Sequence, residues 1–108
     1  MANISELAEA TFDSAVGSGV TLVDFWAPWC GPCRLMGTVL EDQVAPALGE
    51  DVKIGKVNVD ADPALAARFG IQSIPALVIF KDGKAAAQFI GVQKPDTLIE
   101  AIGKVVAQ

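Results

Sequence analysis

Histidine is absent from this 108-residue sequence, and cysteine occurs only twice, as Cys30 and Cys33. A structural zinc site needs about four ligands, and most of them are cysteine or histidine. The sequence therefore argues against a zinc site within one chain, although two chains could share a metal or a cluster. Within one chain, the cysteine pair is either a structural disulfide or a redox-active one.

Positive charge and long apolar runs are also scarce. Eight Lys and Arg stand against 13 Asp and Glu, so the formal net charge is −5. Nucleic acids and acidic membrane surfaces favour clustered Lys and Arg. No apolar run approaches the roughly 18 residues of a membrane span, and the N-terminus lacks a basic region followed by an apolar one. We therefore expect a soluble, unexported protein that binds neither nucleic acid nor membranes.

The length predicts a single domain over residues 1–108. A chain of this size buries roughly 60 to 70% of the surface that its unfolded form exposes, which is enough for one core. No internal repeat, linker or low-complexity tract interrupts the sequence.

Hydrophobic periodicity predicts alternating strands and helices. Strands are expected at residues 4–7, 20–27, 53–59, 76–80 and 86–90. Helices are expected after a Thr11 N-cap, from Cys33 through Leu40 toward Val44, over residues 64–69 behind an Asp62 cap, and from Lys94 onward. Strand–helix–strand order implies parallel pairing, whereas the Asp82-Gly83 turn makes the last two strands antiparallel.

Two of these helices carry apolar stripes that should cover the sheet. The stripes are Met36, Leu40 and Val44 in one helix, and Leu98, Ile99, Ile102, Val105 and Val106 in the last one. Because a proline lacks an amide donor and clashes with the carbonyl four residues back, Pro46 predicts an irregular turn between residues 41 and 46.

Asp24 interrupts a strand that is otherwise apolar on both faces, which is the pattern of a buried central strand. We expect Asp24 to be largely buried near Cys33, with a raised pKa that lets it exchange a proton with that cysteine. The alternative is a structural ion pair between Asp24 and Lys56.

The cysteine pair lies where this strand gives way to a helix. A structural disulfide stabilises more when it encloses a long loop, and this pair encloses only Gly31 and Pro32, so a redox-active pair is favoured. Cys30 precedes the helix and is expected to be an exposed nucleophile, because unpaired amides and the helix dipole stabilise its thiolate. Cys33 lies within the first turn and is expected to resolve the mixed disulfide. Gly31 and Pro32 keep the turn tight, and Pro32 is also an ordinary helix starter.

The segment Trp29-Cys30-Gly31-Pro32-Cys33, following Val23-Asp24-Phe25-Trp26-Ala27, resembles the active-site segment of the thioredoxin family. The resemblance extends along essentially the whole chain. Asp24 matches the family's buried aspartate, Lys56 its lysine, Ile74-Pro75 its cis-proline, Asp82-Gly83 its hairpin turn and Gly91 the glycine beside its active site. The resemblance implies the thioredoxin fold, an α/β arrangement with a mixed sheet of about five strands flanked by about four helices.

The resemblance also implies a function. It implies the reduction of protein disulfides, with the Cys30–Cys33 disulfide as the redox unit and no other cofactor or metal. The implied partners are oxidised proteins and a thioredoxin reductase, either NADPH-linked or ferredoxin-linked. A monomeric cytoplasmic protein is expected. An extended substrate would bind beside Cys30 on an apolar rim formed by Trp29, Ile74, Pro75, Gly91 and Val92.

Several positions leave alternatives open. Trp29 could be a core residue, although Trp26 is the more natural one because it still belongs to the strand pattern. Gly91 could only relieve a strand end. The sequence also departs from the family: Thr38, after Gly37, stands where a kinking proline is usual and predicts only a weak bend. Ala76 stands where threonine is frequent, and Arg34 replaces the commoner lysine.

The sequence is also compatible with two other functions. One is a related oxidant or isomerase, in which the dipeptide between the cysteines usually contains histidine, unlike Gly31-Pro32. The other is a non-catalytic module whose surface docks a partner or a metal.

Overall fold

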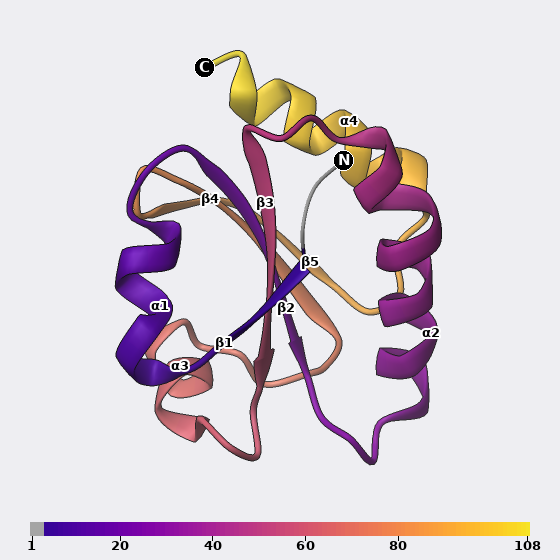
Figure 1. Ribbon diagram of the computed structural model, residues 1–108. Coiled ribbons are helices and arrows are strands. Elements are labelled where there is room, and N and C mark those ends of the chain that lie inside the picture. Colours follow the sequence, from indigo (N-terminus) through magenta and orange to yellow (C-terminus); the bar gives the residue numbers. More distant parts are fainter. Residues whose placement is uncertain (1–3) are drawn as a thin grey trace.

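A mixed sheet forms the middle layer of the protein, whose structure is a computed structural model that describes residues 4–108 (Figure 1). The strand order is β1-β3-β2-β4-β5. The strands are β1 (Ile4–Leu7), β2 (Val20–Trp26), β3 (Val52–Asn58), β4 (Ala76–Lys81) and β5 (Lys84–Ile90). Strands β1, β3 and β2 are parallel, whereas β4 is antiparallel to both β2 and β5. The predicted fold class is confirmed, and the apolar strand β2 is central.

Two pairs of helices cover the two faces of this sheet. Helices α1 (Glu9–Val16) and α3 (Pro63–Arg68) cover one face, and α2 (Gly31–Val39) and α4 (Pro95–Val106) cover the other. A π-helical turn, η1 (Leu40–Val44), and a 3-10 turn, η2 (Ala45–Ala47), follow α2. These irregular turns lie where Pro46 predicts them.

Each pair of helices encloses its own core. The core under α1 and α3 is formed by Leu7, Phe12, Val16, Val23, Phe25, Val57, Leu65, Ala76, Val78 and Phe80. The core under α2 and α4 includes the predicted stripe of Met36, Leu40 and Val44, all of which are fully buried. Of the stripe predicted in the last helix, Leu98, Ile102 and Val105 are buried and Ile99 packs against the core. The prediction that Val106 belongs to this stripe is wrong: Val106 is the last residue of the helix and is 44% exposed, whereas its neighbour Val105 is buried.

Three helix starts differ from the prediction. Helix α1 begins at Glu9, and Thr11 is its third residue, not its N-cap; the Thr11 hydroxyl instead accepts a hydrogen bond from the Ala8 N–H. Helix α2 begins at Gly31, two residues earlier than predicted, so Pro32 is its second residue. Asp62 precedes α3 as predicted, but its carboxylate accepts a hydrogen bond from the Glu9 N–H and does not cap α3.

The turn between β4 and β5 has the backbone geometry of a two-residue hairpin. Asp82 and Gly83 both have positive φ angles, of 50° and 85°, as the Asp-Gly pair predicts. The Asp82 carboxylate also accepts a hydrogen bond from the Gly19 N–H at 2.8 Å. The hairpin is thereby attached to the turn that precedes the central strand β2.

Candidate active site

The Cys30–Cys33 disulfide lies at the junction between β2 and α2. Cys30 is the N-cap of α2 and has an extended backbone, whereas Cys33 is the third residue of the helix. Because one helical turn separates the two residues, their Cα atoms are only 5.2 Å apart, which is within the range that a disulfide needs. Strand β2 delivers the pair to the carboxyl edge of the parallel strands, where open α/β sheets place their chemistry.

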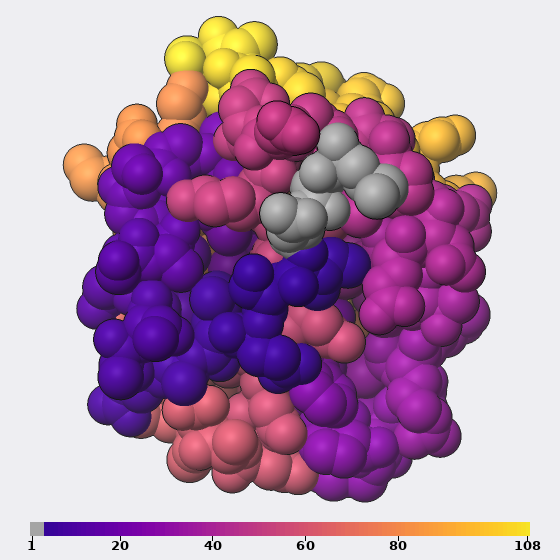
Figure 2. Space-filling view, in the orientation of Figure 1, coloured from indigo at the N-terminus to yellow at the C-terminus, as the bar shows by residue number. Residues whose placement is uncertain are grey.

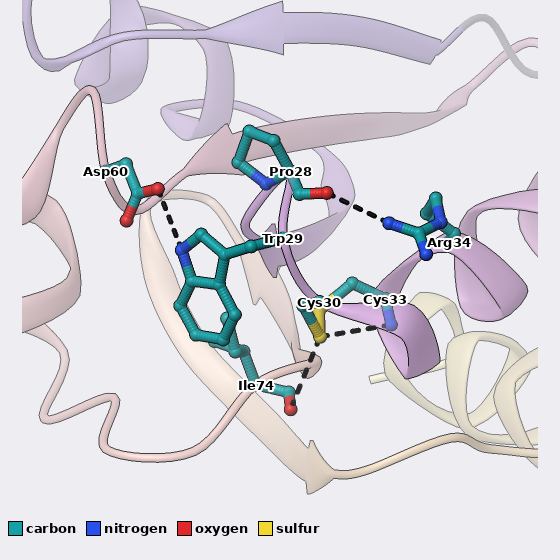
Figure 3. Close-up of a disulfide and its surroundings, with 7 residues drawn as sticks. All are labelled: Pro28, Trp29, Cys30, Cys33, Arg34, Asp60 and Ile74. Atoms are coloured by element: carbon teal, nitrogen blue, oxygen red, sulfur yellow. Dashed lines mark hydrogen bonds between the residues drawn. A yellow bond between two sulfur atoms is a disulfide. The ribbon is translucent and has the colours of Figure 1, made fainter.

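The Cys30 sulfur is held between two backbone groups (Figure 3). The Cys33 N–H donates a hydrogen bond to Cys30 Sγ at 3.2 Å, and the Ile74 carbonyl oxygen lies 4.0 Å from the same sulfur. The Cys33 N–H is one of the amides at the start of α2 that have no partner within the helix. Such amides stabilise negative charge. A thiolate at Cys30 would therefore meet a positive partial charge.

The two cysteines are almost equally buried in this disulfide form. Cys30 is 6% exposed and Cys33 is 3% exposed. The expectation that Cys30 is exposed is therefore wrong for this state, because Cys30 and Cys33 form a buried cluster with Ala27, and the half-buried Trp26 and Ile74 pack against this cluster. What distinguishes the two residues is their position relative to the helix, and not their exposure.

The residues predicted to form an apolar rim come from three separate segments. Trp29 is 69% exposed and Val92 is 44% exposed, whereas Ile74 is half-buried and Pro75 is buried. The Ile74–Pro75 peptide bond is cis, as the resemblance implies. Gly91 has a φ angle of 86°, and its N–H donates a hydrogen bond to the Pro75 carbonyl at 2.8 Å. This bond holds the segment after β5 beside the segment before β4.

Trp29 is oriented by Asp60, a residue that the sequence did not indicate as part of the site. Trp29 Nε1 donates a hydrogen bond to Asp60 Oδ2 at 2.9 Å (Figure 3). The Val59 N–H bonds to the Trp26 carbonyl at 2.8 Å, which brings the end of β3 alongside the active-site loop. The contact spans 31 residues, so no local pattern signals it. The exposure of Trp29 also contradicts the alternative that it is a core residue.

Two further residues at the site were not predicted to belong to it. Ile90, the last residue of β5, is 50% exposed and directly precedes Gly91, so the alternation of the strand could have indicated it. Arg34 Nη1 donates a hydrogen bond to the Pro28 carbonyl at 3.0 Å, which ties the loop before Cys30 to α2 (Figure 3). The Arg34 side chain thus fixes the position of the loop before Cys30 relative to α2.

Asp24 is fully buried on the face of β2 that packs against α2 and α4. Its side chain points to the same face as Leu22, two residues earlier in the strand, and Leu22 belongs to the core under those helices. Neither carboxylate oxygen has a hydrogen-bond partner among residues 4–108. Burial raises the pKa of Asp24 to about 7, and the positive charge of Lys56 opposes this rise. The predicted burial and direction of the pKa shift are confirmed.

The alternative ion pair between Asp24 and Lys56 does not form. The two residues are register partners on β2 and β3, but no contact of 4.0 Å or less joins their charged atoms in the part of the chain that the structure describes. Lys56 Nζ instead lies 4.8 Å from the centre of the Trp26 ring, a cation–π arrangement. Lys56 therefore acts on Asp24 only at a distance.

Trp26 is half-buried, so its prediction as a core residue holds only in part.

Within the described residues, no group of three His, Cys, Asp or Glu side chains is arranged to hold a metal ion. Residues 4–108 also contain no helix of the length and apolarity that crossing a membrane requires.

Comparisons with known proteins agree with this geometry. Residues 3–104 match the family model described as Thioredoxin. The chain is 45% identical to a thioredoxin of Staphylococcus aureus over 101 residues, which is 94% of this chain and 96% of that protein. The crystal structure of a Malassezia sympodialis thioredoxin superposes with a TM-score of 0.84 at 32% identity, covering 96% of this chain and 94% of that one. A mutant thioredoxin from Halobacterium salinarum superposes with a TM-score of 0.85 at 32% identity, covering 94% and 89%.

A cysteine pair that closes a disulfide across the first turn of a helix, at the carboxyl edge of such a sheet, defines a thiol–disulfide oxidoreductase. The family model and the curated relatives match nearly the whole chain, which narrows the assignment from this class of protein to one family. The chain belongs to the thioredoxin family.

Proposed function

We propose that this protein reduces disulfides of other proteins by dithiol–disulfide exchange, as a thioredoxin with the Trp29-Cys30-Gly31-Pro32-Cys33 type of active site. The observation that carries this proposal is the hydrogen bond from the Cys33 N–H to Cys30 Sγ at the start of α2. An amide in that position favours the thiolate form of Cys30, and the thiolate is the attacking species in disulfide exchange.

The reaction has two exchange steps. In the reduced protein, the Cys30 thiolate attacks one sulfur of the substrate disulfide, and the other substrate sulfur leaves as a thiolate. The Cys33 thiolate then attacks Cys30 Sγ, closes the Cys30–Cys33 disulfide and releases the second substrate thiolate. Two electrons pass to the substrate, which takes up two protons, and no bound cofactor or metal is required. The disulfide state described above is the product of this reaction.

Asp24 is the proposed proton carrier for the second step. The Cys33 thiol must lose a proton before it can attack, and a general base works best when its pKa is near the ambient pH. The pKa of about 7 for Asp24 satisfies this condition. Lys56, held over the Trp26 ring, is the proposed supporting charge, since it favours the ionised form of Asp24 without pairing with it.

The proposed substrate surface lies around the buried Cys30 sulfur. Trp29 and Val92 offer exposed apolar area, and Gly31 and Pro32 are exposed at the start of α2. The Ile74–Pro75 segment precedes β4, so its backbone can pair with an extended substrate segment. Because Cys30 is only 6% exposed, a substrate must approach closely along this surface, which favours extended chains over folded ones.

The proposed partners are oxidised proteins and a thioredoxin reductase that regenerates the dithiol, using electrons from NADPH or from ferredoxin. We further propose that residues 1–108 act as a single monomeric domain in the cytoplasm, where such a reductase is available. The protein would then carry electrons between the reductase and its substrates.

Trapping the mixed disulfide tests the assignment of roles. Cys33→Ser should accumulate covalent complexes with oxidised substrate proteins, because Cys30 still attacks and nothing resolves the product. Cys30→Ser is the matched control and should trap none. Non-reducing electrophoresis with mass spectrometry measures both. Equal trapping by the two variants would contradict the assignment.

A redox potential and an activity assay test the direction of the reaction. NADPH-linked insulin reduction with a panel of thioredoxin reductases and ferredoxin-linked reductases should show turnover with at least one reductase. An oxidising potential typical of oxidants or isomerases would argue for that related function instead. Retention of a partner-dependent function by the Cys30→Ser, Cys33→Ser double variant would favour a non-catalytic docking module.

A further inference from the structure

The segment that follows β5 forms one side of the proposed substrate surface, and it turns sharply at its start. Ile90, the last residue of β5, is 50% exposed, and Val92 is 44% exposed. Gly91 lies between them with a φ angle of 86°, a conformation that glycine adopts more readily than other residues. Glycine also loses the most conformational freedom when a chain becomes ordered. The two apolar side chains therefore keep a fixed position only if other contacts hold the segment.

The side chain of Gln93 holds this turn from within. Gln93 Nε2 donates a hydrogen bond to the Ile90 carbonyl at 3.0 Å and another to the Gly91 carbonyl at 3.3 Å. A side-chain amide has two N–H donors, so one residue can satisfy both carbonyl groups. The Gly91 N–H also bonds to the Pro75 carbonyl at 2.8 Å. These three bonds fix the backbone on both sides of the glycine.

The backbone of Gln93 attaches the segment to the cysteine helix. The Gln93 N–H donates a hydrogen bond to Met36 Sδ at 3.3 Å. Met36 is fully buried in α2 and follows Cys33 by about one helical turn. In Figure 1 the segment between β5 and α4 passes behind α2, and in Figure 2 the atoms of α2 form the surface in front of it. The helix that carries Cys33 therefore also supports this side of the substrate surface.

We propose that Gln93 and Met36 are positioning residues, which hold Ile90 and Val92 ready for an extended substrate and thereby favour polypeptide disulfides over small ones. This inference rests on the proposed function. An extended polypeptide has to lie along the surface around Cys30, whereas a small disulfide has to reach only the sulfur of that residue. A surface that is ordered before the substrate arrives avoids an entropic cost of binding. The two residues therefore act on the binding of polypeptides, and not on the exchange step.

Single-turnover kinetics of the dithiol form, prepared with a chemical reductant that is then removed, test the role of the Gln93 amide. Gln93→Met keeps an unbranched side chain and removes both donors. It should raise the half-saturating concentration of insulin by about threefold to tenfold, because a neutral hydrogen bond contributes about that factor. The maximal rate should stay within about twofold, since the substitution removes binding and not transition-state stabilisation. Gln88→Met, the same change at an exposed position of β5, is the matched control and should leave both values unchanged.

A small substrate separates positioning from a general structural effect. The ratio of the second-order rate constant for insulin to that for bis(2-hydroxyethyl) disulfide should fall by about threefold to tenfold in Gln93→Met. Met36→Leu conserves the core volume and removes the sulfur acceptor, so the ratio should fall by about twofold to threefold, a thioether being a weak acceptor. Hydrogen exchange of the Gly91 amide should become faster in Gln93→Met, because the bond to the Pro75 carbonyl opens more often.

The outcomes distinguish this inference from the proposed function. Equal slowing with both disulfides, an unchanged ratio, or unchanged exchange of the Gly91 amide in folded Gln93→Met would overturn the inference while the parent still reduces insulin. These results decide the question even if Met36→Leu does not fold. A parent whose dithiol form reduces neither disulfide would overturn the proposed function and this inference with it.

Discussion

The two faces of the sheet are packed with different kinds of side chain. Four of the five phenylalanines gather on the α1 and α3 face, where the rings of Phe12, Phe69 and Phe80 lie with centroids 5.1 to 5.5 Å apart. The α2 and α4 face is packed mostly with aliphatic side chains and Met36, and it also holds the buried carboxyl group of Asp24.

The α1 and α3 face contributes mainly to stability, whereas the α2 and α4 face carries the groups proposed for the chemistry. Aromatic side chains bury large apolar areas, and edge-to-face pairs add to that stabilisation. A buried carboxylate without a partner is unfavourable, so the α2 and α4 face gives up stability near neutral pH. That face is also the one that carries the cysteine helix α2. The unfavourable carboxyl group of Asp24 thus lies on the face of the sheet where a proton carrier can serve the disulfide.

The largest expected effect comes from the aromatic face. Phe80→Ala should destabilise the protein by about 3 to 5 kcal/mol, because it removes a fully buried ring and leaves a cavity. Phe89→Ala is the control, since Phe89 is half-buried against the other core and should cost less. Denaturant unfolding of the disulfide forms measures both. Equal losses of unfolding free energy in the two variants would contradict the idea that the aromatic face contributes more to stability. A slower rate of disulfide reduction per folded Phe80→Ala molecule would contradict the idea that this face takes no part in the chemistry.

The next effect comes from the buried carboxyl group and depends on pH. A pKa raised from 3.8 to about 7 means that the native state binds more protons between these values, so stability falls as pH rises from about 4 to 7 and is lowest above 7. The full difference corresponds to about 4 kcal/mol. Asp24→Asn should therefore be about 2 to 4 kcal/mol more stable than the parent at pH 9, with little gain at pH 4.

Denaturant titrations of the two disulfide-form proteins at pH 4 and pH 9 check this prediction, and stopped-flow measurements should show slower disulfide exchange in Asp24→Asn. An Asp24→Asn variant that is less stable than the parent at pH 9 would mean that Asp24 and Lys56 stabilise the fold as a pair.

The smallest expected effect tests how Lys56 acts on Asp24. Lys56→Met should raise the pKa of Asp24 further, because the positive charge that opposes the rise is removed. Lys56→Met should lose about 1 kcal/mol more stability at pH 9 than at pH 5, because the positive charge of Lys56 attracts only the ionised form of Asp24. The loss of the cation–π contact with Trp26 is common to both pH values. Carboxyl NMR titration measures the pKa, and Lys84→Met serves as the charge control. An unchanged pKa would mean that Lys56 serves only to pack against Trp26.

Most of the fold was predictable because its signals are local. Short apolar runs and the turn residues between them located all five strands to within two residues at their ends, and Asp82-Gly83 located the hairpin turn. Helix starts were less predictable. Thr11 and Asp62 are residue types that often cap helices. Thr11 instead accepts a hydrogen bond from the Ala8 N–H three residues earlier, and Asp62 accepts one from the Glu9 N–H, a donor 53 residues away that only the folded chain brings near.

The candidate site was predictable in its residues but not in their contacts. The burial of Asp24 followed from its place in an apolar strand, and the raised pKa followed from that burial. The burial of Cys30 did not follow, because it results from packing by Ile74, which is 44 residues away in the sequence.

The chemistry that the chain can perform follows from local sequence: two cysteines lie one helical turn apart, at the end of an apolar strand that contains a single carboxylate. These features depend on spacing and on alternation, which are properties of neighbouring residues. The pairing of the groups around the cysteines, in contrast, depends on how distant segments pack together. It placed Asp60 on Trp29 and the Ile74 carbonyl beside Cys30, and it directed Lys56 to the Trp26 ring and away from Asp24. Such contacts join segments that are distant in the sequence, and side-chain rotamers in the packed core select among the partners available, so no local pattern encodes them.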